Sequence, residues 1–177
     1  MQTHSKQFVF RIAVSHTIAY FLAGIFALAF MNYKEHFSSD TMGILMHPVD
    51  FPIVALGPAL NIFRGIILGL ILLSIQSVIL GDKGFLKLAI LTLGLSLIST
   101  IGPTPGSFDG YIYTKLPTEY HLLGIPEALL YVVVFTSIPY FWYKMEKKSF
   151  NAIAIILVLL ILLMSFAGFL QAKGLMN

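Results

Sequence analysis

One arginine, Arg64, is the residue of this sequence most suited to chemistry, because it is the single Asp, Glu, Lys or Arg in the apolar run 51–81. A charge inside a membrane-spanning segment is costly and usually has a partner. The candidate partners are Glu127, Asp109 and Asp50, in that order. A guanidinium that faces a shallow cavity would also bind a carboxylate or phosphate ligand bidentately. The alternative is that Arg64 lies only about 5 Å along its helix and extends to the nearby interface.

Histidine and carboxylate side chains lie close together at two other places. His47 and Asp50 are three residues apart, and Glu119 and His121 are two apart. Together they could supply nitrogen and oxygen ligands to zinc or another divalent ion. However, Pro48 prevents the first pair from forming a regular helix face, and the sequence has no HExxH motif. We therefore predict no metal site and keep these four residues only as weak candidates.

Glu127 follows Pro126, a residue well placed at the start of a helix. A carboxylate in that first turn interacts favourably with the helix dipole, which explains Glu127 structurally. If the helix instead begins near Leu122, Glu127 lies deeper in the membrane. A role in ligand binding or proton transfer is then favoured.

Other polar or small residues inside apolar runs favour helix packing. His16 lies in a long apolar stretch and predicts a hydrogen bond between helices, and Asn61 and Gln76 are read as packing residues too. Gly65 and Gly69 have the small-xxx-small spacing that lets two helices approach closely. That contact could lie within the chain, or it could join a second copy or another membrane protein.

The elements that must position these residues are membrane helices. Asp, Glu, Lys and Arg are absent from 12–33, 88–108 and 149–172. Because roughly 20 apolar residues of helix cross the hydrocarbon core, these stretches are long enough to span it. We predict an all-α integral membrane protein that is a single polytopic domain, 1–177, with five transmembrane helices. The predicted spans are 8–31, 61–80, 85–101, 126–143 and 150–171.

Composition agrees with this fold and excludes several functions. The chain is 58% hydrophobic and 11% charged, with a mean hydropathy of +0.88, whereas soluble domains are about 25% charged. The absence of cysteine excludes disulfides and thiolate ligands. No P-loop, GxGxxG or GxSxG motif is present, and no basic surface is large enough for nucleic acid. No motif identifies a cofactor.

The distribution of basic residues predicts the orientation. The basic residues assigned to one side are Lys6, Arg11, Lys83, Lys87, Lys144, Lys147 and Lys148. Those assigned to the other side are Lys34, Lys115 and Lys173, with Arg64 near its edge. Because short cytoplasmic loops carry the excess of Lys and Arg, the N-terminus is predicted inside and the C-terminus outside. The plasma (inner) membrane is the expected location.

The outer connections are long, apolar and rich in proline, so we expect them to be ordered and partly buried. Pro52 and Pro58 interrupt 51–60, which predicts that no continuous helix forms there. The segment 102–125 has three prolines and four glycines and is predicted to be a second broken, dipping segment. The alternatives are a cavity lined by these breaks or two ordinary helix ends.

These features predict an outward-facing polar pocket that binds or transports a small ligand, anionic or amphipathic, such as a lipid. The predicted lining residues are Arg64, Glu127, Asp109, Glu119, His121, His47 and Asp50. One alternative is an auxiliary subunit of a larger membrane complex. Another is an enzyme at the outer leaflet, either a metal-assisted hydrolase or a lipid-modifying transferase, with His47 or His121 as base or ligand.

Overall fold

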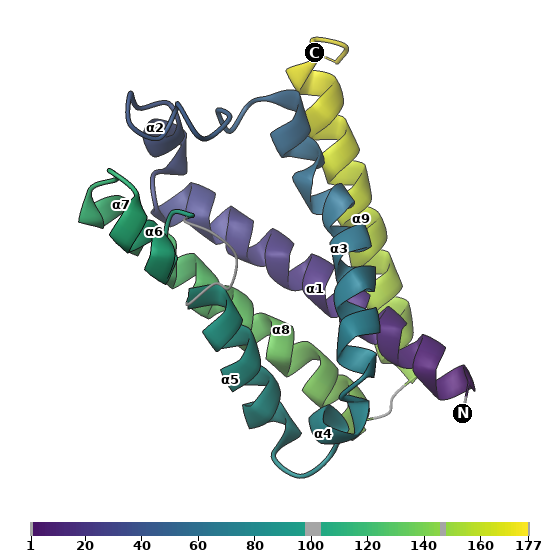
Figure 1. Ribbon diagram of the computed structural model, residues 1–177. Coiled ribbons are helices and arrows are strands. Elements are labelled where there is room, and N and C mark those ends of the chain that lie inside the picture. Colours follow the sequence, from purple (N-terminus) through teal and green to yellow (C-terminus); the bar gives the residue numbers. More distant parts are fainter. Residues whose placement is uncertain (1, 98–103, 146–147, 177) are drawn as a thin grey trace.

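The described part of the chain consists of helices and their connections, with no strand. The structure, a computed structural model, describes residues 2–97, 104–145 and 148–176 (Figure 1). Its helices are α1 (Gln2–Phe30), α2 (Tyr33–Phe37), α3 (Pro52–Leu73), α4 (Gln76–Leu80), α5 (Gly84–Leu97), α6 (Phe108–Tyr113), α7 (Thr118–Leu123), α8 (Ile125–Met145) and α9 (Lys148–Ala172).

Four helical segments are long and apolar enough to cross a membrane, so the prediction of an all-α chain with membrane-spanning helices is confirmed. They are Ser5–Phe30, Pro52–Leu73, Thr118–Met145 and Ser149–Ala172. Helix α5 is also apolar but has 14 residues, which at 1.5 Å per residue is roughly 21 Å. Residues 98–101, the end of the predicted third span, lie outside the described residues. So do residues 102–103 of the predicted second broken segment.

Helix α1 is the centre of the packing. It contacts α3 on one side and α8 on the other, while α3 also packs on α9 and α5 packs on α8 (Figure 1). More than half of its membrane-spanning window is buried, against about a fifth for the other three long segments. Large apolar side chains therefore remain exposed on the outer helices, which is the surface that lipid chains cover.

The polar residues of α1 are buried because this helix is central. Ser15 and Thr17 satisfy their hydroxyls within the helix, by donating to the carbonyls of Arg11 and Ala13 at 2.7 and 3.0 Å. His16 cannot do this, since an imidazole has no such local partner, and it reaches the neighbouring helices. The prediction of an interhelical hydrogen bond for His16 is confirmed.

The prediction that prolines break 51–60 was wrong. Helix α3 begins at Pro52 and continues through Pro58 to Leu73, so the membrane helix begins well before residue 61. Pro52 is tolerated because it occupies the first turn, where its missing N–H has no partner in any case. At the second proline, Ser165 of α9 inserts its hydroxyl beside α3. The hydroxyl donates to the Ala55 carbonyl at 2.5 Å and accepts from the Ala59 N–H at 3.4 Å. A neighbouring helix thus satisfies the weakened backbone.

Gly65 and Gly69 of α3 pack inside the chain. A Cβ added to Gly65 would lie 2.8 Å from the Ala13 carbonyl oxygen, and one added to Gly69 would lie 2.9 Å from that of Val9. Both glycines therefore lie at the close contact between α3 and α1. Of the alternatives for the small-xxx-small pattern, this is the contact within the chain.

The connections fall into two groups at opposite ends of the molecule. The N-terminus, α4 and the start of α9 lie at one end, and α2, α6, α7 and the C-terminus lie at the other (Figure 1). Of the basic residues assigned to the first end, Lys147 lies outside the described residues. We call the second group, α2, α6 and α7 with their connections, the cap.

Candidate functional site

A polar cavity of about 410 Å³ lies between α1, α3, α5 and α8, beneath part of the cap. Its wall includes ionisable and hydroxyl side chains that come from segments far apart in the sequence. They are His16, Tyr20, Arg64, Thr92, Ser96, Thr104, Ser107, His121, Glu127 and Tyr131. We call it the polar cavity because these polar groups line it, whereas small and apolar side chains usually fill the interior of a membrane helix bundle.

His16 is the central residue of a hydrogen-bonded network across three helices. The Asn61 amide nitrogen of α3 donates to the Gly57 carbonyl at 2.9 Å, which leaves its oxygen to accept from His16 Nε2 at 3.2 Å. In the neutral imidazole, His16 Nδ1 then accepts from the Tyr131 hydroxyl of α8 at 2.7 Å. The Asn61 oxygen thus selects the neutral tautomer that has its proton on Nε2. The Tyr131 hydroxyl keeps an oxygen lone pair on the wall of the cavity.

Arg64 lies near the middle of its helix. Because α3 begins at Pro52, the arginine is roughly 18 Å from the helix start at 1.5 Å per residue. The sequence-based estimate of about 5 Å was wrong for this reason, and an easy extension to the outer interface is lost with it. Arg64 lines the polar cavity together with His16 and Tyr131. Its side chain is exposed, and no salt bridge joins it to Glu127 or to any other carboxylate in the described residues.

A hydrogen bond from the cap holds Glu127. This residue lies in the first turn of α8, and the Tyr33 hydroxyl of α2 donates to its Oε2 at 2.5 Å. Burial, together with the Glu127 carboxylate, raises the pKa of Tyr33 well above its usual value. The hydroxyl therefore remains a donor, and this bond joins α2 to the membrane helix α8.

A second cavity, of about 400 Å³, adjoins the first on the side of the cap and is largely apolar. Its wall includes Phe21, Ile25, Leu28, Met42, Met46 and Val54. We call it the apolar cavity. Tyr20, Pro105, Gly106, Gly124 and Glu127 line both spaces. The polar cavity and the apolar cavity therefore lie on either side of a shared wall.

His121 is a structural residue of the cap. Its Nδ1 accepts from the Gly106 N–H at 3.2 Å, so its Nε2–H donates to Thr114 Oγ1 at 3.2 Å. Gly106 has φ +80°, a conformation that favours glycine. Ser107 accepts from the Gly110 N–H at 2.8 Å and caps α6. These hydrogen bonds join the connections of the cap to α6 and α7.

The structure brings together three of the seven predicted site residues, Arg64, Glu127 and His121, on the wall of the polar cavity. The other four do not line it. Asp109 and Glu119 lie in the first turns of α6 and α7. His47 is exposed and stacks on Phe51 with ring centroids 4.3 Å apart, and Asp50 is exposed. Among the described residues, no three His, Asp or Glu side chains form a group that could hold a metal ion.

Two important residues were not assigned to the site from sequence. Tyr131 and Tyr33 belong to a tyrosine-rich sequence in which nothing distinguishes them from interfacial aromatic residues. His16 was visible as the single histidine of an apolar run, but its partners come from helices that only the packing brings together.

The fold and this interior polar network define the class: the chain is a helical integral membrane protein, with four helices of membrane-spanning length and composition. Comparison with known proteins gives no closer assignment, since no family model, curated protein or solved structure matches the chain.

Proposed function

We propose that this protein binds a small amphipathic anion, with the charged group in the polar cavity and the apolar part in the apolar cavity. One observation carries the proposal: a guanidinium near the middle of α3 lines a polar cavity and has no salt bridge within the described residues. An arginine at the centre of a membrane helix costs at least about 2.5 kcal/mol. An anionic ligand would offset that cost, and a carboxylate or phosphate matches the guanidinium fork.

The neighbouring groups favour an anion with an apolar tail. Both ring nitrogens of His16 have hydrogen-bond partners, so the imidazole does not compete for the guanidinium. The hydroxyl of Ser96 lines the same space and can donate to an anion, whereas that of Thr92 donates to the Leu88 carbonyl at 2.7 Å. Beyond the shared wall, the apolar cavity offers aliphatic and methionine side chains to a tail. In the transport version of the same proposal, the bound ligand is also carried across the membrane.

The membrane arrangement belongs to this proposal as well. We place α5 as a fifth spanning helix, because it runs beside α8 from the end that holds α4 to the end that holds the cap (Figure 1). The N-terminus is then cytoplasmic, in accord with the basic residues at that end, and the cap faces outward in the plasma membrane.

Binding of dodecanoate, compared with the uncharged analogue dodecanol, tests the proposal on the purified chain in detergent. We expect wild type to prefer dodecanoate, and we expect Arg64→Gln to weaken dodecanoate binding by about tenfold or more, since a charge-assisted hydrogen bond contributes about 1.5–3 kcal/mol. Arg64→Lys should retain part of the preference, because it keeps the charge and loses the bidentate fork.

Lys173→Gln is the matched control, because it removes one positive charge from an exposed side chain outside both cavities. It should leave dodecanoate binding unchanged. Equal binding of the acid and the alcohol by wild type, or undiminished binding by Arg64→Gln, contradicts the proposal.

An auxiliary subunit is the second candidate, and one observation favours it. A broad apolar groove of about 530 Å³ runs between α1, α3 and α9, and its wall includes Val9, Phe10, Ile62, Ile66 and Leu70. A partner helix could fill it. If the purified chain is monomeric in mild detergent and binds dodecanoate alone, this candidate loses to the first.

A further inference from the structure

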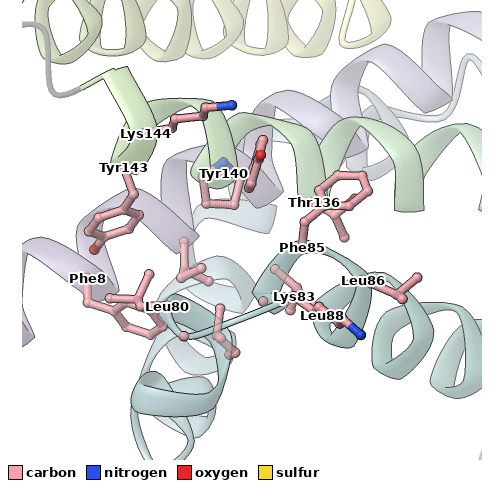
Figure 2. A pocket seen from close by; sticks show the side chains of 15 residues that line it. Phe8, Leu80, Lys83, Phe85, Leu86, Leu88, Thr136, Tyr140, Tyr143 and Lys144 are labelled. Atoms are coloured by element: carbon pink, nitrogen blue, oxygen red, sulfur yellow. The ribbon is translucent and has the colours of Figure 1, made fainter.

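A third cavity, of about 440 Å³, lies at the opposite end of the molecule from the cap. Figure 2 shows side chains from three parts of the fold around it: Phe8 of α1, Lys83 and Phe85 of the α4–α5 turn and α5, and Tyr140 and Lys144 near the end of α8. We call it the basal cavity. It shares no lining residue with the apolar cavity and is a separate site from the cap region.

The charged side chains that the described residues contribute to the basal cavity are both positive. Lys83 and Lys144 line it, and no Asp or Glu of the described residues does. Asp82, next to Lys83 in the chain, does not line the cavity, and no salt bridge joins the two in the described residues. The Lys144 ammonium lies 5.5 Å from the centroid of the Tyr140 ring. The remaining polar groups on the wall include the hydroxyls of Tyr140 and Tyr143, which can donate to an anion.

A third cation lies behind this wall. Arg11 of α1 is 8% exposed, and its guanidinium lies 4.3 Å from the centroid of the Tyr143 ring, which lines the cavity. Its Nε has no hydrogen-bond partner in the described part of the chain. The aromatic face stabilises the guanidinium only in part, so the region keeps an excess of positive charge.

The backbone fixes Lys83 at this place. Its φ is +53°, a left-handed conformation that costs a residue with a Cβ about 1–2 kcal/mol. The Gly84 N–H donates to the Gly81 carbonyl at 3.1 Å and closes the turn. A Cβ on Gly84 would lie 1.8 Å from the Ile79 carbonyl oxygen, so glycine is required there. The tight turn therefore presents the lysine from a fixed point opposite α8.

The rest of the wall is apolar, with Ile12, Leu80, Leu86 and Leu88 among its residues. Aromatic rings and lysines at one end of a helical bundle are typical of the level of lipid headgroups. The positive charge and the apolar wall beside it match the two parts of an anionic phospholipid, its negative headgroup and its acyl chains.

We propose that the basal cavity binds an anionic phospholipid from the leaflet at the N-terminal end of α1. The phosphate lies between Lys83 and Lys144, and an acyl chain lies along the apolar wall between α5 and α8. This site does not depend on the ligand proposed for the polar cavity.

Native mass spectrometry of the full chain, released from detergent with either phosphatidylglycerol or phosphatidylcholine, tests this site. Wild type should retain phosphatidylglycerol in clear preference. The double variant Lys83→Gln/Lys144→Gln should lose that preference by about tenfold or more, because each basic residue near a membrane surface contributes to attraction of anionic lipid. The same charge change at the cap, Lys34→Gln/Lys115→Gln, is the matched control and should leave it unchanged.

Three results overturn the proposal: equal retention of the two lipids by wild type, an undiminished preference in Lys83→Gln/Lys144→Gln, or the same loss in the control pair. Displacement of the lipid by inorganic phosphate alone would also contradict it, because the acyl chain would then contribute nothing. Arg64→Gln should keep the phosphatidylglycerol preference, so failure of the polar-cavity proposal and failure of this one are distinguishable. Thermal unfolding of each variant without added lipid shows whether it is folded.

Discussion

At the scale of single residues, the interior of this protein depends on polar groups that other helices satisfy. His16 has both ring nitrogens occupied by Asn61 and Tyr131, and Ser165 bonds to α3 beside a proline. In lipid no water replaces a missing partner, so each of these side chains must find one within the bundle. Arg64 differs from them because it faces a cavity rather than a fixed partner.

The Ser165 contact gives a residue-scale prediction. Ser165→Ala should destabilise the chain by about 0.6 kcal/mol, and at most about 1.7, the range of interhelical hydrogen bonds in membranes. In a Pro58→Ala background the loss should be smaller, since a regular helix supplies its own backbone bonds to α3. Unfolding in mixed micelles of increasing dodecyl sulfate measures all four proteins of the cycle.

Ser74→Ala is the control for this cycle, because within the described residues the Ser74 hydroxyl, at the end of α3, bonds only to the Ile71 carbonyl, at 2.7 Å. The stability lost on Ser74→Ala should be the same with proline or with alanine at position 58. An equal effect of Ser165→Ala with and without the proline would show that Ser165 does not support the α3 backbone.

At the scale of elements, the contact between α1 and α3 positions the polar cavity. Gly65 and Gly69 let the two backbones approach, and this brings His16 within reach of Asn61. The same approach places α1 between α3 and α8, so that Tyr131 reaches the other ring nitrogen. The spacing of α1 and α3 and the hydrogen-bonded network around His16 therefore depend on the same contact.

Enlarging the glycine at this contact should separate the helices. Gly65→Ala places a Cβ 2.8 Å from the Ala13 carbonyl oxygen and 2.9 Å from its Cα, both backbone atoms that cannot rotate away. We expect a loss of about 1–3 kcal/mol of stability, the usual cost of overpacking, and weaker dodecanoate binding. The same unfolding and binding measurements apply.

Gly94→Ala in α5 is the matched substitution, since an added Cβ there meets nothing within 4 Å. It should be neutral or should stabilise α5 by up to about 1 kcal/mol, because alanine is the better helix former. Equal losses at the two glycines would contradict a special role for the α1–α3 contact.

At the scale of the whole molecule, the two ends differ in chemistry. The cap closes one end with short helices, hydrogen-bonded turns and the bond between Tyr33 and Glu127. The other end has the tight α4–α5 turn and the cationic basal cavity. This difference between the two ends suits a protein whose ends face different compartments.

The five-span arrangement predicts the sides of single cysteines, which this chain permits because it has no native cysteine. Asp82→Cys should react with a membrane-impermeant maleimide only from the cytoplasmic side, and Lys115→Cys and Lys173→Cys only from the outside. If α5 does not cross the membrane, all three react from the same side. That outcome would overturn the orientation and the fifth span together.

The membrane character and the approximate helices can be predicted from the amino-acid sequence, because long uncharged apolar runs have few other stable structures. Arg64 can be identified in the same way, since a lone charge in such a run stands out. The continuation of α3 through Pro58 could not be predicted without the fold, because the supporting hydroxyl comes from Ser165, far along the chain. The tertiary structure likewise placed Glu127 with Tyr33 and left His47 at the surface, because cavities and polar partners depend on helix packing, which no local pattern encodes.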